Sequence, residues 1–293
     1  MDTIKKILNR DGIFTSREDL IISLKQFNPI KKVISKYQIS DSELWDNFVQ
    51  MSDYLSEQQN PDDFVYSTKI QRDLEGNLIF DKKINSNEKA KKYLLTQNIF
   101  FKNISKPVID KPITEIEWID DVNHFDLFEF IINLKNKLEK TNNLKKIRGC
   151  FIDGESSLFR NQVLSAFANF FAINDYSTAY LNVNYLEDEL KKSFNSSDSD
   201  INYILDTLSK LDVLILDEIG FKTYNPWFFE NILIKILENR YINQKTTFIG
   251  SYVDLMNIEK NISNKEKRIS KIALTKFRHL VKQLCQTEIW VGK

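Results

Sequence analysis

Two acidic residues that follow an apolar run are the side chains best placed to do chemistry. The segment "DVLILDEIG", residues 212–220, is apolar at each position from Val213 to Leu216 and then carries Asp217 and Glu218. Such a run is typical of a central parallel strand covered on both faces, and open α/β sheets bind ligands at the carboxyl ends of their strands. In an ATPase built on this sheet, the first acid orients magnesium and its water, and the second polarises the attacking water. The alternative is that two acids merely end a strand at a solvated edge.

A second segment begins like a phosphate-binding unit. "CFIDGESSLFRNQVLSAFANFFA", residues 150–172, has a short apolar strand, a glycine and a helix of apolar period. A phosphate-binding loop has the pattern G-x-x-x-x-G-K-[ST], in which backbone N–H groups surround the phosphates, the lysine reaches the terminal phosphates and the hydroxyl holds magnesium. Aligned without gaps, Gly154 takes the first glycine position, Arg160 the lysine position and Asn161 the hydroxyl position.

The residues between these positions are also unsuited to phosphate. Phe159 replaces the glycine before the lysine, Ser157 replaces a glycine inside the loop, and Glu155 adds a negative charge. The planar fork of Arg160 does not substitute for the point charge of a lysine, and the helix dipole supplies only about 0.3–1 kcal/mol at exposed sites. We interpret the segment as a decayed ATP site, with the retained acids as the main argument for a divergent but functional one. ATP and magnesium are cofactors only if the site is active. We predict that the 154–161 loop forms no open phosphate cradle and that Phe159 turns toward apolar neighbours.

The elements that must position these residues are predicted from the apolar pattern beyond residue 147. Short apolar runs, "GCFID", "TAYLNVN", "DVLILD", "TTFIG" and "TEIWVG", alternate with helical patterns. This alternation is typical of βαβ units around a parallel sheet. We therefore expect an α/β fold with a five-stranded parallel sheet in which "VLILD" is central.

The chain before this region has a different character. Residues 1–104 are predicted to form a smaller, mostly helical domain, with a turn or small hairpin at "DLEGNLIFDKKI". A capping box at Ser40 to Glu43 opens a helix. Its apolar stripe is interpreted as core, with a partner groove as the alternative; it consists of Leu44, Phe48, Met51 and Leu55. Pro107 and Pro112 mark residues 105–119 as a linker, and 120–293 follow as the second domain.

Composition narrows the class of protein without naming a partner. With 42% hydrophobic and 28% charged residues the 293-residue chain is expected to be globular, and 41 basic residues balance 41 acidic ones. No apolar run reaches the roughly 18 residues of a membrane span, so we expect a cytoplasmic protein without a membrane partner. Cys150 and Cys285 are too far in sequence from each other and from the histidines for an ordinary zinc cluster, and buried thiols are expected.

Taken together, the order of these segments resembles the bacterial replicative-helicase loaders of the DnaI/DnaC type, which are AAA+ ATPases. The resemblance covers about residues 120–291 and is strongest in "VLILDEIGFKTYNPWFFENILIKILENR". It implies an AAA+ sheet, with Asp217 and Glu218 at the Walker B positions. Ser251 or Tyr252 falls on the sensor-1 segment, where the family usually has asparagine.

Two arginines are also assigned roles, and Arg278 has two alternatives. Arg278 in "TKFRHL" matches an arginine that resembles an arginine finger, which acts on the nucleotide of a neighbouring subunit. The structural alternative for Arg278 is a surface ion pair. Arg240, at the end of "ILENR", is expected to cap the C-terminus of its own helix.

The resemblance also implies partners. A replicative DNA helicase would dock on the N-terminal region, where the family often has a zinc site but no cysteine precedes Cys150 here. It further implies an oligomer with the helicase, and single-stranded DNA as a candidate partner of residues 257–282, which contain eight Lys/Arg and two Glu. A solvated helix face is the alternative. The sequence thus indicates a helicase-loader-like protein of replication initiation with lost or weak ATP turnover; the alternatives are an active AAA+ loader and an interaction protein on an ATPase scaffold.

Overall fold

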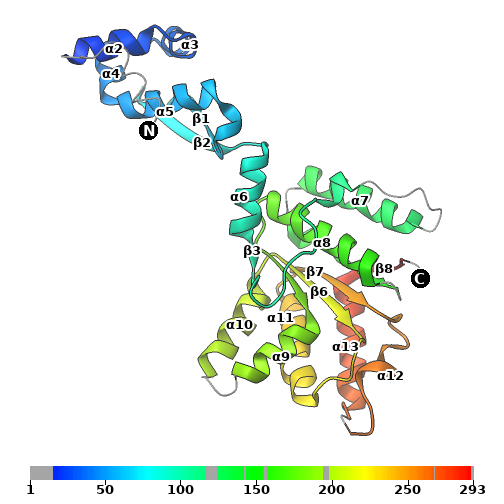
Figure 1. The fold of residues 1–293 in the computed structure, drawn as a ribbon. Coiled ribbons are helices and arrows are strands. Elements are labelled where there is room, and N and C mark those ends of the chain that lie inside the picture. Colours follow the sequence, from blue (N-terminus) through cyan, green and yellow to red (C-terminus); the bar gives the residue numbers. More distant parts are fainter. Residues whose placement is uncertain are drawn as a thin grey trace. The chain divides into compact units, whose positions relative to one another are not determined.

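The chain divides into two compact units. The computed structural model describes residues 16–116, 124–141, 143–154, 157–193, 198–266 and 268–291. Its units are Met1–Tyr93 and Leu94–Lys293 (Figure 1). The division lies earlier than the predicted boundary at residue 104, within helix α6 (Glu88–Asn98).

The segment expected to be a linker packs against the second unit. The Val108 N–H donates to Ser165 Oγ at 2.9 Å, and Asn169 Nδ2 donates to the Ile109 carbonyl at 2.6 Å. The side chains of Ser165 and Asn169 both lie on helix α8 (Ser157–Ile173). Ile113, in a short 3-10 helix (Ile113–Glu115), is buried. The prolines therefore break regular structure, as predicted, while the segment itself is anchored. Residues 117–119 lie outside the described part of the chain.

The described residues of the first unit are mostly helical with one hairpin, as expected. Its helices are α2 (Arg17–Lys25), α3 (Asn28–Tyr37), α4 (Asp41–Asp46) and α5 (Phe48–Gln59), with a short 3-10 helix at Pro61–Asp63. Strands β1 (Tyr66–Arg72) and β2 (Leu78–Ile84) pair antiparallel. Gly76 has φ of 90° in the connecting turn, a conformation that glycine adopts without steric cost.

The predicted capping box begins α4. Ser40 Oγ accepts from the Glu43 N–H, and the Glu43 carboxylate accepts from the Ser40 N–H. The helix is interrupted at Asn47, so the predicted single helix is two helices. The apolar stripe is core, as interpreted: Phe48 packs partly against the cluster, and Leu44, Met51 and Leu55 have no exposed surface. These last three side chains are therefore wrong candidates for partner anchors, because no partner could reach them.

The second unit is built on a parallel sheet with the predicted central strand. The strand order is β3-β5-β6-β7-β4-β8. The five expected strands are β4 (Gly149–Asp153), β5 (Thr178–Asn182), β6 (Val213–Ile219), β7 (Thr246–Ser251) and β8 (Cys285–Trp290). The sixth, β3 (Ile99–Phe100), pairs with β5 and was not predicted, because two residues directly after a helix carry no period of their own. β6 lies between β5 and β7, and every residue in it is buried.

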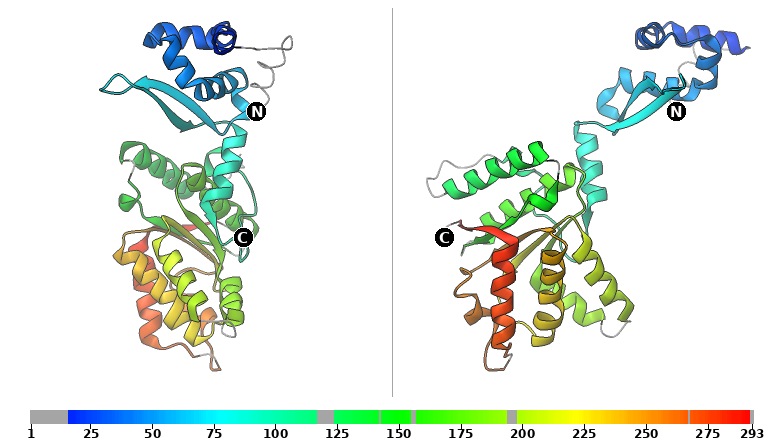
Figure 2. Two further views of the ribbon diagram at one scale, coloured as in Figure 1. Left: turned by 90° about the vertical axis from the view of Figure 1, so that its left-hand side faces the viewer. Right: turned by 180° about the vertical axis from the view of Figure 1, so that it is seen from behind.

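Helices cover both faces of this sheet (Figure 2). α7 (Phe125–Thr141) and α8 pack on one face. The other face is covered by α9 (Val183–Ser193), α10 (Asp198–Lys210), a π-helix (Phe228–Leu233) that continues as α11 (Ile234–Ile242), α12 (Ile258–Ile262) and α13 (Lys271–Leu284). A further 3-10 helix spans Leu144–Lys146.

Alternation along β6 explains why its sequence is uniformly apolar. Leu214 and Leu216 belong to the core cluster beneath α9–α13, while Val213 and Ile215 belong to the cluster beneath α7 and α8. Successive side chains of a strand point to opposite faces, so a strand covered on both sides needs apolar residues at every position.

Composition led to expectations about the two cysteines and about membrane-spanning helices. Cys150 and Cys285 are free and buried, as predicted. Within the described ranges, none of the helices combines the length and the apolar character that a bilayer span requires.

Candidate functional site

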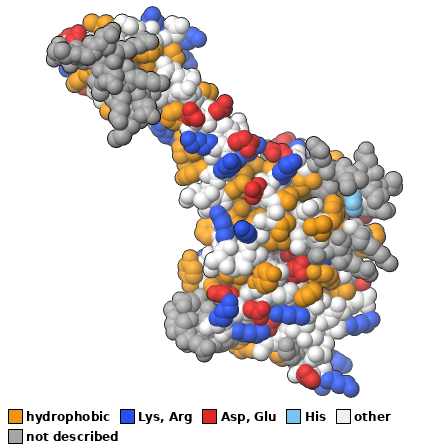
Figure 3. All heavy atoms as spheres, viewed as in Figure 1, with side chains coloured by type: hydrophobic (Ala, Val, Ile, Leu, Met, Phe, Trp, Pro, Cys, Tyr) orange, Lys and Arg blue, Asp and Glu red, His pale blue; other side chains and the backbone are white. Residues whose placement is uncertain are grey.

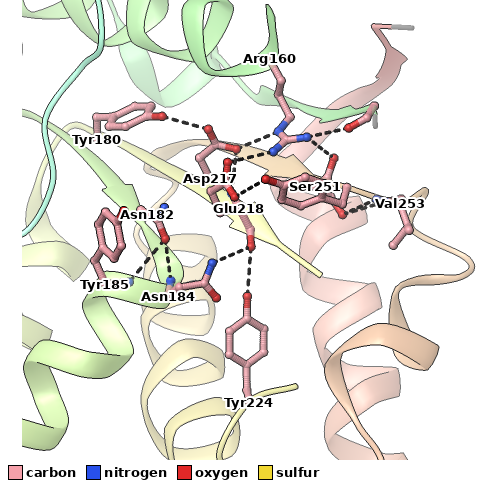
Figure 4. A network of polar contacts seen from close by, with 12 residues as sticks. Arg160, Tyr180, Asn182, Asn184, Tyr185, Asp217, Glu218, Tyr224, Ser251 and Val253 are labelled. Atoms are coloured by element: carbon pink, nitrogen blue, oxygen red, sulfur yellow. Dashed lines mark hydrogen bonds and ion pairs between the residues drawn. The ribbon is translucent and has the colours of Figure 1, made fainter. Parts of the chain in front are cut away.

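The structure brings Arg160, Asp217 and Glu218 together at the carboxyl end of β6 (Figure 4). Arg160 Nε lies 2.9 Å from Asp217 Oδ1, and Arg160 Nη2 lies 3.2 Å from Glu218 Oε1. Arg160 and Asp217 have no exposed surface, and Glu218 is 8% exposed. The alternative of a solvated strand end is therefore wrong, because both acids are buried and paired with one cation.

The guanidinium of Arg160 also holds two backbone carbonyls. Nη1 donates to the Gly154 carbonyl at 2.7 Å and to the Ser251 carbonyl at 3.1 Å. The Tyr252 ring lies against the guanidinium, with 4.3 Å between Cζ and the ring centroid. One side chain on the first turn of α8 thus connects the ends of β4, β6 and β7.

Tyrosine hydroxyls complete the hydrogen bonding of the two acids. Tyr180 Oη donates to Asp217 Oδ2 at 2.9 Å, and Tyr252 Oη donates to Glu218 Oε2 at 2.6 Å. Burial, with the Asp217 carboxylate beside it, raises the pKa of Tyr180 well above its usual value, so its hydroxyl stays protonated and donates. Burial alone would lower the pKa of Arg160, but the carboxylates of Asp217 and Glu218 outweigh burial and the pKa is raised. The arginine is therefore a permanent cation.

The backbone around the acids is unusual in two places. Glu218 has φ of 68°, in the left-handed region that non-glycine residues rarely adopt. Its carbonyl accepts from Tyr224 Oη at 3.3 Å and Asn184 Nδ2 at 3.4 Å, which hold this conformation. On the neighbouring strand, a Cβ at Gly250 would overlap Asp217 Oδ1, so this position requires glycine.

The sequence-predicted cofactor residues are engaged by the chain itself. The Gly154 N–H donates to the Ser251 carbonyl at 3.2 Å, and the Gly154 carbonyl accepts from Arg160. Asn161 lies on the first turn of α8 and is partly buried. Neither backbone group of Gly154 thus points to a phosphate position.

Phe159 turns toward the core, as predicted. Its ring packs against the cluster beneath α7 and α8 and stacks on the His124 ring with centroids 4.6 Å apart. Two residues of the predicted loop, Glu155 and Ser156, lie outside the described part of the chain. The prediction of no open cradle is therefore supported by Gly154, Phe159 and Arg160 only.

The two remaining arginines have structural partners. Arg278 Nη2 lies 2.7 Å from Glu259 Oε1 in a partly exposed pair, which is the structural alternative named for it. Arg240 is fully buried and donates to the carbonyls of Leu208 and Leu211 at 2.7 and 2.9 Å. The expectation that Arg240 caps its own helix is wrong, because these carbonyls lie at and just beyond the end of α10.

The described residues of the basic stretch 257–282 present no exposed Phe, Trp or Tyr ring for base stacking. Phe277, its one residue of the Phe, Trp and Tyr types, is fully buried. Lys276 is paired with Glu238, and Arg278 with Glu259. Over the described atoms in Figure 3, Lys/Arg and Asp/Glu side chains are interspersed. These observations favour the solvated helix face.

Sequence reasoning missed Tyr180, Asn184 and Gly250 as parts of the site. Tyr180 had one signal: it is the tyrosine inside "TAYLNVN" that falls within a predicted strand of the sheet. The roles of Asn184 and Gly250 depend on strand register, which the sequence does not specify.

Comparisons with known proteins agree with this architecture. No family model matches the chain. The replicative helicase loader DnaI of Bacillus subtilis (strain 168) is 26% identical over 133 residues, which are 45% of this chain and 41% of the relative. The match therefore spans less than half of the relative's length.

Two solved structures have a fold similar to that of this chain. A crystal structure of DnaI superimposes with a TM-score of 0.53 at 22% identity, covering 66% of this chain and 97% of that one. A proposed primosome component from Streptococcus pyogenes serotype M3 gives 0.50 at 18% identity, covering 69% and 96%. The chain thus carries the AAA+ fold of DnaI, and over less than half of its length it resembles a bacterial replicative-helicase loader in sequence.

Proposed function

We propose that this chain is a helicase-loader-like protein that holds or delivers a replicative DNA helicase in the initiation of replication, without turning over ATP. The sequence match to the loader DnaI and the shared fold support the replication role. The N-terminal unit, which is compact by itself, is the proposed helicase-binding part. A fold alone does not fix a function, and the contacts of the site are what oppose ATP turnover.

The observation that carries this proposal is the position of Arg160. In a phosphate-binding loop the residue at this position reaches the terminal phosphates, whereas Arg160 turns to the two acids. Asp217 and Glu218 would have to orient magnesium and water, yet their carboxylates are committed to Arg160, Tyr180 and Tyr252. Magnesium-ATP could enter only if these hydrogen bonds were broken.

Breaking them is unfavourable. Breaking a buried ion pair costs about 3–5 kcal/mol where no other group takes over the charge that is left. The residues that would recover this energy from a nucleotide are missing, because no lysine reaches the phosphates and Asn161 cannot supply the hydroxyl for magnesium. ATP and magnesium therefore fit this site poorly, and Asp217, Glu218, Gly154, Arg160 and Asn161 are proposed as a structural rather than a catalytic set.

The second candidate is an active AAA+ loader with a divergent loop. It is favoured by the presence of both acids at the end of the central strand and of a helix, α8, directly after the loop. In that function Arg278 would act on the nucleotide of a neighbouring subunit, and Arg160 would swing away on ATP binding.

Titration of the full chain with fluorescent ATP and magnesium separates the two. We expect no saturable binding up to about 1 mM ATP, a weak limit that corresponds to about −4 kcal/mol. The matched measurement is capture of the purified helicase by the full chain with and without ATP, where equal capture is expected. Saturable ATP binding, or capture that requires ATP, would restore the active loader. Failure to capture the helicase in either condition would favour an interaction protein with another partner.

A further inference from the structure

The outer edge of the sheet and helix α7 form one open face of the second unit. β8 is the last strand in the sheet order, and β4 is its only partner among the described strands. α7 lies on the same side of this unit as β8 (Figure 1). A groove runs between them, and its lining includes Asp126, Glu129, Asn133 and Lys137 of α7 and Gln286 and Thr287 of β8.

The polar residues on the groove side of α7 follow a palindromic pattern. Along the helix they are two acids, an amide and two bases, spaced by three, four, four and three residues: Asp126, Glu129, Asn133, Lys137 and Lys140. Residues three or four apart lie on one face of a helix. All of them are exposed except Lys137, which is half-buried. Counted from Asn133, the spacing is the same in both directions while the sign of the charge is opposite.

This pattern is complementary to a second copy of itself. If two α7 helices lie side by side and antiparallel with Asn133 opposite Asn133, Glu129 of each faces Lys137 of the other. Asp126 then faces Lys140 in the same way, and two-fold symmetry forms each pair twice, as in an isologous interface. Within the described ranges, neither acid forms an ion pair with a cation of its own chain. Lys137 Nζ donates to the neutral Gln286 Oε1 at 3.1 Å, so its charge is also available to a second copy.

The helix dipole alone does not explain the pattern. The dipole favours acids in the first turn and bases in the last, and its effect falls off within one turn. Glu129 and Lys137 lie further inside α7 (Phe125–Thr141) than these turns. On another side of the helix the order is reversed, because Lys135 precedes Glu139, and these two residues line a separate groove. The order of acid before base is therefore specific to the groove side.

The edge of β8 suits the same arrangement. Beyond one register shift at its start, β8 runs regularly against β4 from Thr287 to Trp290. Its other edge has backbone N–H and C=O groups with which an antiparallel strand can pair, and β8 contains neither lysine nor proline, which often protect such edges. Trp290 is 51% exposed, and tryptophan is enriched in protein interfaces. A two-fold axis perpendicular to the sheet makes both α7 and β8 antiparallel to their copies.

We infer that the groove side of α7 and the edge of β8 bind a second copy of this chain, antiparallel about a two-fold axis at Asn133. The inference goes beyond the proposed function, because it depends on neither the helicase nor the nucleotide site. Pairing of Glu129 with Lys137 of the second copy fixes the register of the two chains.

The test reverses single charges in the full chain. Glu129→Lys and Lys137→Glu each place like charges opposite one another twice in the dimer. Sedimentation velocity is measured from about 1 to about 100 µM, a range that covers micromolar dissociation constants. We expect wild type to dimerise and each reversal to weaken dimerisation by at least about tenfold, since two attractive pairs become repulsive. Glu139→Lys and Lys135→Glu are the matched controls on the other side of α7, and both should dimerise like wild type.

A mixture of the two reversed variants makes the outcome decisive. Glu129→Lys carries two cations at the paired positions and Lys137→Glu carries two anions, so a mixed dimer regains both attractions. The equimolar mixture, and the double variant with both reversals in one chain, should therefore dimerise again. Circular dichroism verifies that each variant is folded.

Three results would each overturn the inference: a wild-type chain that stays monomeric over the whole range, reversals that are no more harmful than the controls, or a mixture that stays monomeric. None of these measurements involves the helicase, so such a failure is distinct from failure of the proposed function.

Discussion

At the scale of single residues, the site depends on small positions that leave room for the buried charges. Gly250 on β7 faces Asp217, and an added Cβ would overlap Asp217 Oδ1 and approach Leu164 Cδ1 to 2.5 Å. Neither neighbour can move easily, because Asp217 is held by Arg160 and Tyr180 and Leu164 is fully buried. Glycine is therefore required at position 250 because neighbouring side chains lie too close for a Cβ, and not because of its backbone angles.

Gly250→Ala should destabilise the second unit by about 3 kcal/mol or more, at or beyond the upper end of overpacking costs. Gly76→Ala is the control, since a Cβ there meets nothing within 4 Å and only the positive φ opposes it, at a cost of about 1–2 kcal/mol. Urea unfolding followed by separate probes in the two units measures both. Equal losses for the two variants would contradict the packing argument.

Asp153, at the end of β4, makes the free energy of unfolding depend on pH. Burial, with the charges of Glu288 and Asp254 nearby, raises its pKa to about 6. Because this folded-state pKa lies above the unfolded value, the carboxylate destabilises the fold above pH 6, and the cost disappears as the pH falls toward the unfolded value. Asp153→Asn should therefore stabilise the chain at pH 7.5 by about 1 kcal/mol after allowance for solvent screening.

Thermal melts of Asp153→Asn and wild type between pH 5 and pH 8 provide the measurement, and the difference should shrink toward pH 5. Asp254 is the control of opposite sign, because hydrogen bonds from Asn257 lower its pKa. Asp254→Asn should remove a stabilising charge at neutral pH. A gain for Asp153→Asn that does not change with pH would show that relief of charge is not its cause.

At the scale of elements, two buried arginines connect segments that are distant in sequence. Arg160 joins α8 to three strand ends, and Arg240 joins α11 to the end of α10 and the start of β7 through the Leu208, Leu211 and Thr246 carbonyls. Burial lowers the pKa of Arg240 to about 9, so it remains charged at neutral pH. Each arginine donates to buried backbone carbonyls from two or more segments.

Arg240→Ala should cost about 3 kcal/mol, because it leaves several buried acceptors unpaired at about 1–3 kcal/mol each, with partial relaxation. Arg278→Ala removes one partly exposed ion pair with Glu259 and should cost less than about 1 kcal/mol. The difference is measured as the urea dependence of circular dichroism. A large loss for Arg278→Ala would indicate a role beyond its surface pair.

At the scale of the whole molecule, two compact units divide the proposed tasks. α6 runs from the first unit into the second, and β3 directly after it pairs with β5. The expected N-terminal domain of residues 1–104 therefore includes the sheet edge of the second unit. Partner-binding surfaces of the first unit must be sought among exposed side chains, since Leu44, Met51 and Leu55 are core.

We predict that the first unit binds a replicative helicase without added nucleotide and that the second unit alone does not. Fragments 1–98 and 88–293, each of which keeps α6, are compared with the full chain in a capture assay with and without ATP. Circular dichroism first verifies that each fragment is folded. Equal capture by fragment 88–293, or capture that appears only with ATP, would contradict the division of tasks.

The sequence by itself determined five of the six strands of the sheet and the location of the site. A run such as "VLILD" is typical of a central strand covered on both faces, and the capping box at Ser40 begins α4 through contacts three residues apart. Such features depend on local pattern and burial, which the order of residue types specifies. The absence of the lysine, the glycines and the hydroxyl from the loop was equally visible.

Only the tertiary structure decided what the changed residues do instead. That Arg160 pairs with Asp217 and Glu218, 57 and 58 residues away, depends on the order and register of β4, β6 and β7. The same is true of Tyr180 beside Asp217, of Gly250 beneath it and of Arg240 at the end of α10. Contacts between distant segments follow from how strands pair and helices pack, and a linear pattern does not contain that information.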